Sequence, residues 1–186
     1  RFGRVTLPPP GGDVIGRRRV DTHFLALEAL GAEVQVGDSY ELFGKTLRGA
    51  DIFLDEPSVT GTENALMAAV RAQGRTVLRN AASEPHVQDL ARLLVAMGAH
   101  IEGIGSNTYV IEGGHPLHGA SYTIGPDHIE IGSFIGLAAV TNSALTIDGV
   151  RGDALRGTLL GFERLGIRPR LDGQQLIIDA DQERRI

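Results

Sequence analysis

Apolar residues recur at helical spacing in three segments that lie at nearly equal intervals along the chain. The apolar positions of the three segments are Phe24, Leu25, Leu27 and Leu30; Leu90, Leu93, Leu94 and Met97; and Leu155, Leu159, Phe162 and Leu165. Such spacing is typical of a helix that buries one face. Leu30, Met97 and Leu165 are 67 and 68 residues apart, and each precedes a glycine that suits a helix C-terminal cap. The spacing predicts an internal structural repeat.

Short apolar runs and further helical patterns complete the predicted repeat. Strands are expected at residues 40–43, 76–78, 109–111, 144–147 and 176–178. Second helices are expected over residues 62–72 and 130–140. The order predicts β-α-β-α-β-β units, with the first unit truncated at its start and the other two nearly complete. Because each unit ends in a hairpin, we expect an α/β chain of the α+β kind, with a mixed sheet in every unit and the helices packed inside.

Composition favours a packed protein and disfavours several classes of function. Hydrophobic residues make up 42% of the 186 positions, and no long polar run indicates disorder. The absence of Cys excludes disulfides and thiolate zinc sites and fits a reducing, cytoplasmic compartment. A net charge of −5 disfavours binding to nucleic acid, and no apolar stretch has the length of a membrane helix. The first residue, Arg1, favours a piece cut from a longer chain.

The segment 8–23 is the densest candidate site. A pair of glycines permits a tightly turned or mobile loop, and Asp13 lies a few residues before three consecutive arginines at 17–19. Asp21 is expected to open a helix with His23 on its first turn. A carboxylate, a guanidinium and an imidazole at this spacing suit acid–base chemistry on an anionic substrate. A surface turn with solvated arginines and a helix-capping Asp21 explains the same residues, and both interpretations stay open.

The segment 55–64 is a second candidate, because it runs from a predicted strand into a predicted helix. Its hydroxyls and backbone N–H groups gather at a helix N-terminus, which is a natural anion site. Helix capping by Ser58 or Thr62 is the simpler alternative. Glu84 and Asp127 likewise precede predicted helices and suit helix starts.

Metal and cofactor chemistry find little support in the sequence. Two histidines lie within residues 113–119, but no carboxylate stands at helical spacing from them, so they do not predict a zinc site. The chain has no glycine loop of the Walker or Rossmann type. We expect neither a metal nor a cofactor.

The order of the motifs along the chain is more specific than any one motif. The motifs are Leu-Pro-x-x-Gly-Gly-Asp-x-Ile-Gly-x-Arg-x-Val-Asp-x-His at 7–23, the strand-to-helix turn at 55–64, Asn-Ala-Ala-Ser-Glu-Pro at 80–85, Met-Gly-Ala-His-Ile at 97–101, Tyr-Val-Ile-Glu-Gly at 109–113 and Pro-Asp-His-Ile-Glu-Ile-Gly-Ser-Phe at 126–134. In this order they resemble the motifs of the UDP-N-acetylglucosamine enolpyruvyl transferase family, over nearly the whole chain.

The resemblance implies the enolpyruvyl transferase fold, in which two similar domains each hold three units around a pseudo-threefold axis. This fold is an inside-out α/β barrel, with helices inside and sheets outside. Residues 1–125 would form part of the domain with the catalytic loop. Residues 126–186 would form one unit of the second domain after the hinge. The remainder of the parent chain would form the other side of the substrate cleft.

The resemblance also implies a reaction, namely transfer of enolpyruvyl from phosphoenolpyruvate to the 3-hydroxyl of UDP-N-acetylglucosamine with release of phosphate. This is the first committed step of peptidoglycan synthesis, and it links the protein to cell-wall biogenesis, cell shape, the cell cycle and cell division. The two substrates are the implied partners, and the fragment alone is expected to be inactive.

Site residues carry over from the resemblance position by position. Asp13 stands where the family usually has Cys, and its implied role is proton transfer or product release. Arg18 matches the arginine that binds phosphate, and His23 matches a catalytic histidine. The substrate-binding positions implied by the match are Arg18, Ser58, Val59, Thr60, Glu84 and Asp127.

Several positions depart from the family pattern and keep alternatives open. Arg19 replaces Pro, Glu56 replaces a basic residue, Thr60 replaces Gly and His128 replaces Arg. These departures favour, as the alternative, a divergent or non-catalytic paralogue. A shikimate-pathway enolpyruvyl transferase, which shares the fold, is a further alternative. Asp13 in place of Cys predicts resistance to fosfomycin, which alkylates that Cys in family members.

Overall fold

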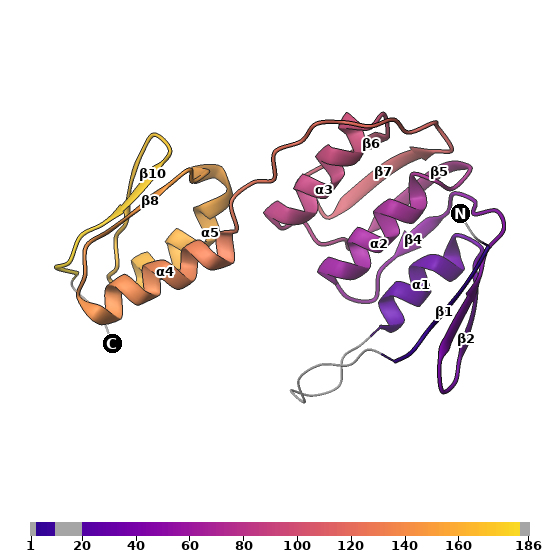
Figure 1. The fold of residues 1–186 in the computed structure, drawn as a ribbon, viewed down its shortest axis with the longest axis horizontal. Helices are drawn as coiled ribbons and strands as arrows, with labels where there is room; N and C mark the ends of the chain where they lie inside the picture. Colours follow the sequence, from indigo (N-terminus) through magenta and orange to yellow (C-terminus); the bar gives the residue numbers. More distant parts are fainter. Residues whose placement is uncertain (1–2, 10–19, 183–186) are drawn as a thin grey trace. The chain divides into compact units, whose positions relative to one another are not determined.

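The computed structural model describes residues 3–9 and 20–182, and these residues divide between two compact units (Figure 1). The first unit is Arg1–Tyr122 and the second is Thr123–Ile186. The division falls close to the expected domain boundary at residue 126, but the assignment of the units to two domains of a larger protein stays a prediction. Asp13 and Arg18 lie outside the described residues.

The first unit contains two sheets and three helices in its described residues. Its elements are β1 (Arg4–Leu7), α1 (Asp21–Ala29), β2 (Glu33–Val36), β3 (Tyr40–Phe43), β4 (Asp51–Phe53), α2 (Val59–Ala69), β5 (Gly74–Arg79), α3 (Pro85–Ala96), β6 (His100–Glu102) and β7 (Thr108–Gly113). One sheet has the order β1-β3-β2 and is antiparallel throughout. The other has the order β4-β5-β7-β6, with β4 and β5 parallel and the remaining pairs antiparallel.

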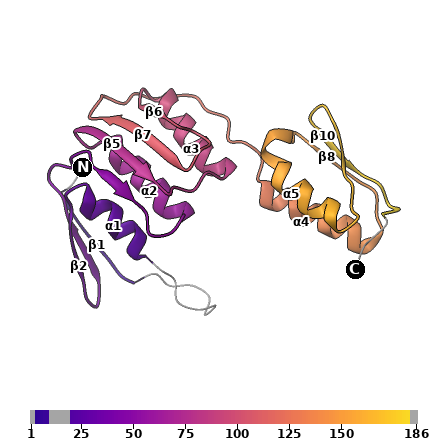
Figure 2. The ribbon, with the colours of Figure 1, turned by 180° about the vertical axis from the view of Figure 1, so that it is seen from behind.

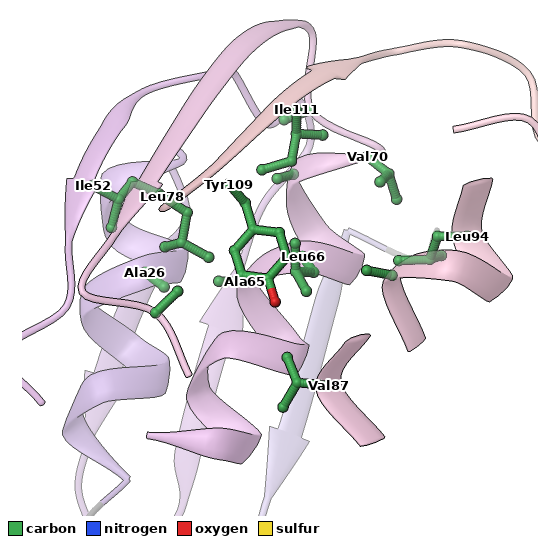
Figure 3. Close-up of a cluster of buried hydrophobic side chains, with 14 of the residues drawn as sticks. Ala26, Ile52, Ala65, Leu66, Val70, Leu78, Val87, Leu94, Tyr109 and Ile111 are labelled. Carbon is green, nitrogen blue, oxygen red and sulfur yellow. The ribbon is translucent and has the colours of Figure 1, made fainter. Parts of the chain in front are cut away.

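Helix α2 lies between α1 and α3 and forms the centre of the first unit (Figures 1 and 2). Its Leu66 is fully buried among Leu78 of β5 and Tyr109 and Ile111 of β7, as Figure 3 shows. Side chains alternate along the strands, so that Ile52 of β4 is buried while its neighbour Phe53 is 66% exposed. The helices therefore pack together on one face of the four-stranded sheet, and the other face is solvated.

The second unit has a smaller core built from fewer elements. It contains α4 (His128–Thr141), β8 (Leu145–Asp148), α5 (Gly152–Arg164), β9 (Arg170–Asp172) and β10 (Gln175–Ile178). Its sheet has the order β8-β10-β9 and is antiparallel. Ile135 of α4, Leu155 of α5 and Leu176 of β10 are fully buried and form its centre.

The predicted helices and strands are confirmed, and so is the repeat. β1-α1-β2-β3, β5-α3-β6-β7 and β8-α5-β9-β10 follow one another with the same order and the same antiparallel pairing. Gly31, Gly98 and Gly166 follow the three equivalent helices at φ values of 95°, 102° and 81°, so the predicted left-handed caps are confirmed.

The expectation of a mixed sheet in every unit is wrong. Among the strands that the structure describes, only the β4-β5-β7-β6 sheet contains a parallel pair, because its β4 precedes the first helix of a complete β-α-β-α-β-β unit. The segment 114–127 stands at the equivalent place before α4 and forms no strand. Without that first strand, the hairpin and its neighbour pair only in antiparallel fashion.

The segment that follows β7 is fastened to the first unit. The backbone N–H of His118 donates to the carbonyl oxygen of Met97 at 2.9 Å. The Tyr122 hydroxyl donates to Asp89 Oδ1 of α3 at 3.1 Å. The ring of His115 lies 4.4 Å from that of His100, centroid to centroid. These contacts explain why residues up to Tyr122 belong to the first unit.

Candidate site at the N-terminal ends of α1 and α2

The first turns of α1 and α2 approach each other closely and carry most of the described candidate residues. Gly61 in the first turn of α2 permits this approach, since a Cβ there would lie 3.0 Å from both Ser58 Oγ and Thr22 Cγ2. A residue with a Cβ would therefore require the Ser58 or Thr22 side chain to shift. Polar side chains from both helices therefore converge here.

Thr22 of α1 joins its helix to the turn that leads into α2. This threonine is buried, and its hydroxyl lies 2.9 Å from Asp55 Oδ1 and 3.4 Å from Glu56 Oε1. A hydroxyl has a single proton, so the shorter distance identifies Asp55 as its main acceptor. The two carboxylates are thereby held beside the first turn of α2.

His23 lies one residue further along α1 and contacts α2 through both ring nitrogens. Its Nε2 is 3.2 Å from Thr60 Oγ1, and its Nδ1 is 2.7 Å from the side-chain nitrogen of Asn64. The ring is half-buried, whereas Thr60 and Asn64 are exposed. The structure therefore brings His23 beside the 55–64 turn, a proximity that the sequence did not predict.

Ser58 is the N-cap of α2, and its Oγ accepts a hydrogen bond from the Gly61 N–H at 3.1 Å. Thr62 is not the cap. Its hydroxyl is buried inside the helix, donates to the Ser58 carbonyl oxygen at 2.7 Å and accepts from the Ala82 N–H at 2.9 Å. Because the cap is Ser58, α2 begins at Val59, three residues earlier than expected.

The start of α2 keeps the character of an anion site although it is capped. The first N–H groups of a helix have no acceptor within the helix, and the helix dipole adds partial positive charge there. Val59 and Thr60 occupy this first turn. The carboxylates of Asp55 and Glu56 meet the same end, so the local charge is mixed.

The remaining predicted site residues lie elsewhere. Glu84 is the residue before α3, makes no side-chain cap bond, and has a buried Oε2 with no hydrogen-bond partner among the described residues. Burial raises the pKa of the neighbouring Tyr109, and the charge of Glu84 adds to that effect. Asp127 caps α4 in the second unit, where its Oδ1 accepts from the N–H groups of Ile129 at 2.8 Å and Glu130 at 3.3 Å.

Helix capping accounts for Asp127, whereas the capping interpretation of Asp21 is wrong. Asp21 is the first residue of α1, and the N-cap position is held by Val20, which offers no side-chain acceptor. Asp21 and Asp55 instead border a groove of about 420 Å³ whose apolar wall includes Phe24 and Val34.

Sequence reasoning included Thr22 and Asn64 in the two candidate segments but gave neither residue a role in the site. Asn64 lies four residues after Thr60, which places the two side chains on one face of α2. That spacing was visible in the sequence. The partner on α1 was not, because it depends on how the two helices cross. Among residues 3–9 and 20–182, no group of three His, Asp or Glu side chains is placed to hold a metal ion.

The fold defined by these units is that of the enolpyruvyl transferases. The enolpyruvyl transferase NikO from Streptomyces tendae superposes on 96% of this chain with a TM-score of 0.78 and 22% identity, over 44% of its own length. EPSP synthase from Acinetobacter baumannii superposes on 96% of this chain with a TM-score of 0.68 and 20% identity, over 43% of its own length. At these identities the likeness shows the fold alone.

The sequence shows the family. The model of EPSP synthase (3-phosphoshikimate 1-carboxyvinyltransferase) matches residues 2–168, and the chain belongs to that family. It is 62% identical over its whole length to a UDP-N-acetylglucosamine 1-carboxyvinyltransferase of Bradyrhizobium diazoefficiens and 55% identical to one of Treponema pallidum. The chain spans 43% and 44% of the length of these two relatives.

None of the helices in the described part of the chain combines the length and the apolar character needed to cross a membrane.

Proposed function

We propose that the protein containing this chain transfers enolpyruvyl from phosphoenolpyruvate to the 3-hydroxyl of UDP-N-acetylglucosamine and releases phosphate. The observation that carries this proposal is the 62% identity, over all 186 residues, to a relative named for that carboxyvinyl transfer. A role in peptidoglycan synthesis and a cytoplasmic location belong to the same proposal and rest on the resemblance.

The reaction requires proton transfer and stabilisation of an anionic substrate. A proton added to the methylene carbon of phosphoenolpyruvate leaves positive charge at C2, and the sugar hydroxyl adds there and loses its proton. Loss of phosphate and of one proton from the methyl group formed in the first step then restores the double bond. Asp13 is the proposed proton-transfer group, and Arg18 is the proposed phosphate ligand, because its planar fork of donors suits phosphate oxygens.

The geometry at α1 and α2 supports a place for the nucleotide part of the acceptor. Ser58, Val59 and Thr60 form the start of α2, where backbone N–H groups and the helix dipole favour a diphosphate. Glu84 and Asp127 are proposed to bind substrate from the starts of α3 and α4. We also propose that the rest of the parent chain supplies the other side of the cleft.

Product analysis with the parent chain tests the proposal. The parent, mixed with phosphoenolpyruvate and UDP-N-acetylglucosamine, should release phosphate and form a nucleotide sugar whose mass has grown by one enolpyruvyl group. The 186-residue chain, assayed alone, should stay at background because half of the cleft is missing. A parent that releases no phosphate with this acceptor would refute the proposed function.

Resistance to fosfomycin is part of the proposal, because Asp13 stands where the resemblance places the alkylated Cys. A thiolate is a strong nucleophile toward an epoxide, whereas a carboxylate is a weaker one. The parent should keep its activity in the presence of fosfomycin, and Asp13→Cys should introduce time-dependent inactivation with a mass increase on the loop peptide. A fosfomycin adduct on the unmutated loop would contradict this role of Asp13.

A further inference from the structure

His23 is the point at which α1 is joined to the exposed face of α2. Thr60 and Asn64, one helical turn apart on α2, each reach one ring nitrogen of His23, at 3.2 Å and 2.7 Å. Both contacts lie within hydrogen-bond distance. An imidazole with both nitrogens engaged by one helix is fixed in position and in ring orientation.

The chemistry of the two partners selects one tautomer. The side-chain nitrogen of Asn64 carries two protons and has no lone pair to offer, so it donates to Nδ1 of His23. A neutral imidazole that accepts at Nδ1 carries its proton at Nε2. That N–H donates to Thr60 Oγ1, because a hydroxyl oxygen can accept a hydrogen bond.

We infer that Asn64 is a positioning residue that holds His23 as the Nε2–H tautomer, with Thr60 as the acceptor of that proton. The placement of this device in the catalytic cycle rests on the proposed function, whereas the tautomer itself does not. Thr60 is exposed, and a hydroxyl that accepts from His23 still has its own proton to donate. That proton is available to an anionic ligand at the start of α2, the place proposed for the diphosphate.

In this arrangement Thr60 is a hydrogen-bond donor to the ligand, and Asn64 fixes the orientation of the His23 ring. His23 polarises the Thr60 hydroxyl, so Thr60 becomes a stronger donor than an isolated threonine. Asn64 prevents the imidazole from turning its protonated nitrogen away. Thr60, which departs from the glycine of the family pattern, thereby adds a side-chain donor that glycine lacks.

Nitrogen NMR of this 186-residue chain tests the inference without any assay of activity. Two-bond proton–nitrogen spectra at about pH 9, where imidazoles are neutral, report which nitrogen of each histidine is protonated. His23 should show an unprotonated Nδ1 and a protonated Nε2. The other five of the six histidines serve as internal references. A protonated Nδ1 in the unmutated chain would overturn the inference.

A single substitution should reverse the tautomer. Asn64→Asp keeps the shape of the side chain but presents only acceptors, so Nδ1 of His23 should become protonated. Glu63→Gln, the matched control, changes one charge at the adjacent position of α2 and should leave His23 as the Nε2–H tautomer. An Nδ1 that stays unprotonated in Asn64→Asp would also overturn the inference. If that variant fails to fold, the spectrum of the unmutated chain still decides.

Kinetics of the parent enzyme separate this inference from the proposed function. Because the inference places the Thr60 donor at the diphosphate, Asn64→Asp should raise the KM for UDP-N-acetylglucosamine about tenfold and leave kcat and the KM for phosphoenolpyruvate unchanged. A parent without transferase activity refutes the proposed function and leaves the NMR result to stand by itself. An active parent whose Asn64→Asp variant keeps the unmutated KM for UDP-N-acetylglucosamine shows that the positioning does not affect binding of the diphosphate and overturns that part.

Discussion

Helices α2 and α4 occupy equivalent places in two successive repeats, but they differ in burial. Met67 is the one exposed large hydrophobic side chain of α2, all of whose residues are described. Four such side chains of α4 are exposed, namely Ile129 at 63%, Phe134 at 43%, Leu137 at 52% and Val140 at 69%. α2 is packed between α1 and α3, whereas α4 packs against α5 in its own unit.

The difference shows that the repeat pattern determines the elements and that neighbouring elements determine burial. The apolar stripe of a helix is buried only when another helix or a sheet lies against it. Helix α4 is apolar around most of its circumference, which is typical of a helix that is buried on all sides. The same order of helices and strands therefore yields a well-filled core in one unit and a small one in the other.

The largest expected effect comes from truncating the centre of the first unit. Leu66→Ala in α2 should lower the free energy of unfolding of that unit by about 2–5 kcal/mol, because it removes a fully buried side chain and leaves a cavity. Urea unfolding followed by circular dichroism measures the change. Met67→Ala, at the adjacent exposed position, should cost less than about 0.5 kcal/mol.

Equal losses in Leu66→Ala and Met67→Ala would break the comparison, because they would mean that burial does not determine how much a side chain of α2 stabilises the unit. A second pair of variants tests the same link between burial and stability within α4. Ile135→Ala, at a fully buried position, should destabilise the second unit, whereas Leu137→Ala, at a position 52% exposed, should change its stability little.

Helix capping should produce a smaller effect that is similar in the two units. Ser58→Ala removes the cap of α2, and Asp127→Ala removes the cap of α4. Each should cost about 0.5–2 kcal/mol, measured by thermal unfolding. Ser58→Gly and Asp127→Gly are the controls. Each should lower the free energy of unfolding by only a few tenths of a kcal/mol relative to the unmutated chain. A glycine variant less stable than its alanine counterpart would contradict the capping role.

The smallest expected effect is a dependence of stability on pH from one ion pair in each unit. Hydrogen bonding to Arg79, at 2.8 Å and 3.0 Å, lowers the pKa of Asp51, and hydrogen bonding to Arg151 lowers that of Asp153. A lowered folded-state pKa stabilises the fold above the unfolded pKa, and this stabilisation is lost as the pH falls through the folded pKa.

Asp51→Asn and Asp153→Asn should therefore each make the acid-induced loss of stability below about pH 4 slightly shallower. Unfolding midpoints measured from neutral to acidic pH would detect this shallower loss of stability. Both carboxylates are exposed, so the difference should shrink in high salt. A steeper acid response in either variant would show that the sign of the pKa shift is wrong.

Much of the fold could be predicted from the sequence, because it depends on local signals. The caps at Gly31, Gly98 and Gly166 and the strands that follow them come from apolar spacing and glycine placement. The antiparallel sheet of the second unit could not be predicted, because it depends on a strand that residues 114–127 do not form. Strand pairing is a tertiary property that a local pattern does not contain.

The candidate site was predictable to a similar degree. Ser58 and His23 were found from their positions at the starts of helices. The bonds of Thr22 to Asp55 and of His23 to Asn64 join residues more than 30 positions apart. They arise from the close crossing of α1 and α2 at Gly61, which no spacing along the chain encodes.

The acceptor preference of the parent enzyme tests the central claim most directly. The measurement is kcat/KM for phosphate release from phosphoenolpyruvate, with UDP-N-acetylglucosamine and with 3-phosphoshikimate as competing acceptors. If the start of α2 binds the diphosphate as proposed, the parent should favour the nucleotide sugar by at least about 100-fold, a discrimination of roughly 3 kcal/mol. Equal rates with the two acceptors, or a preference for 3-phosphoshikimate, would contradict the account.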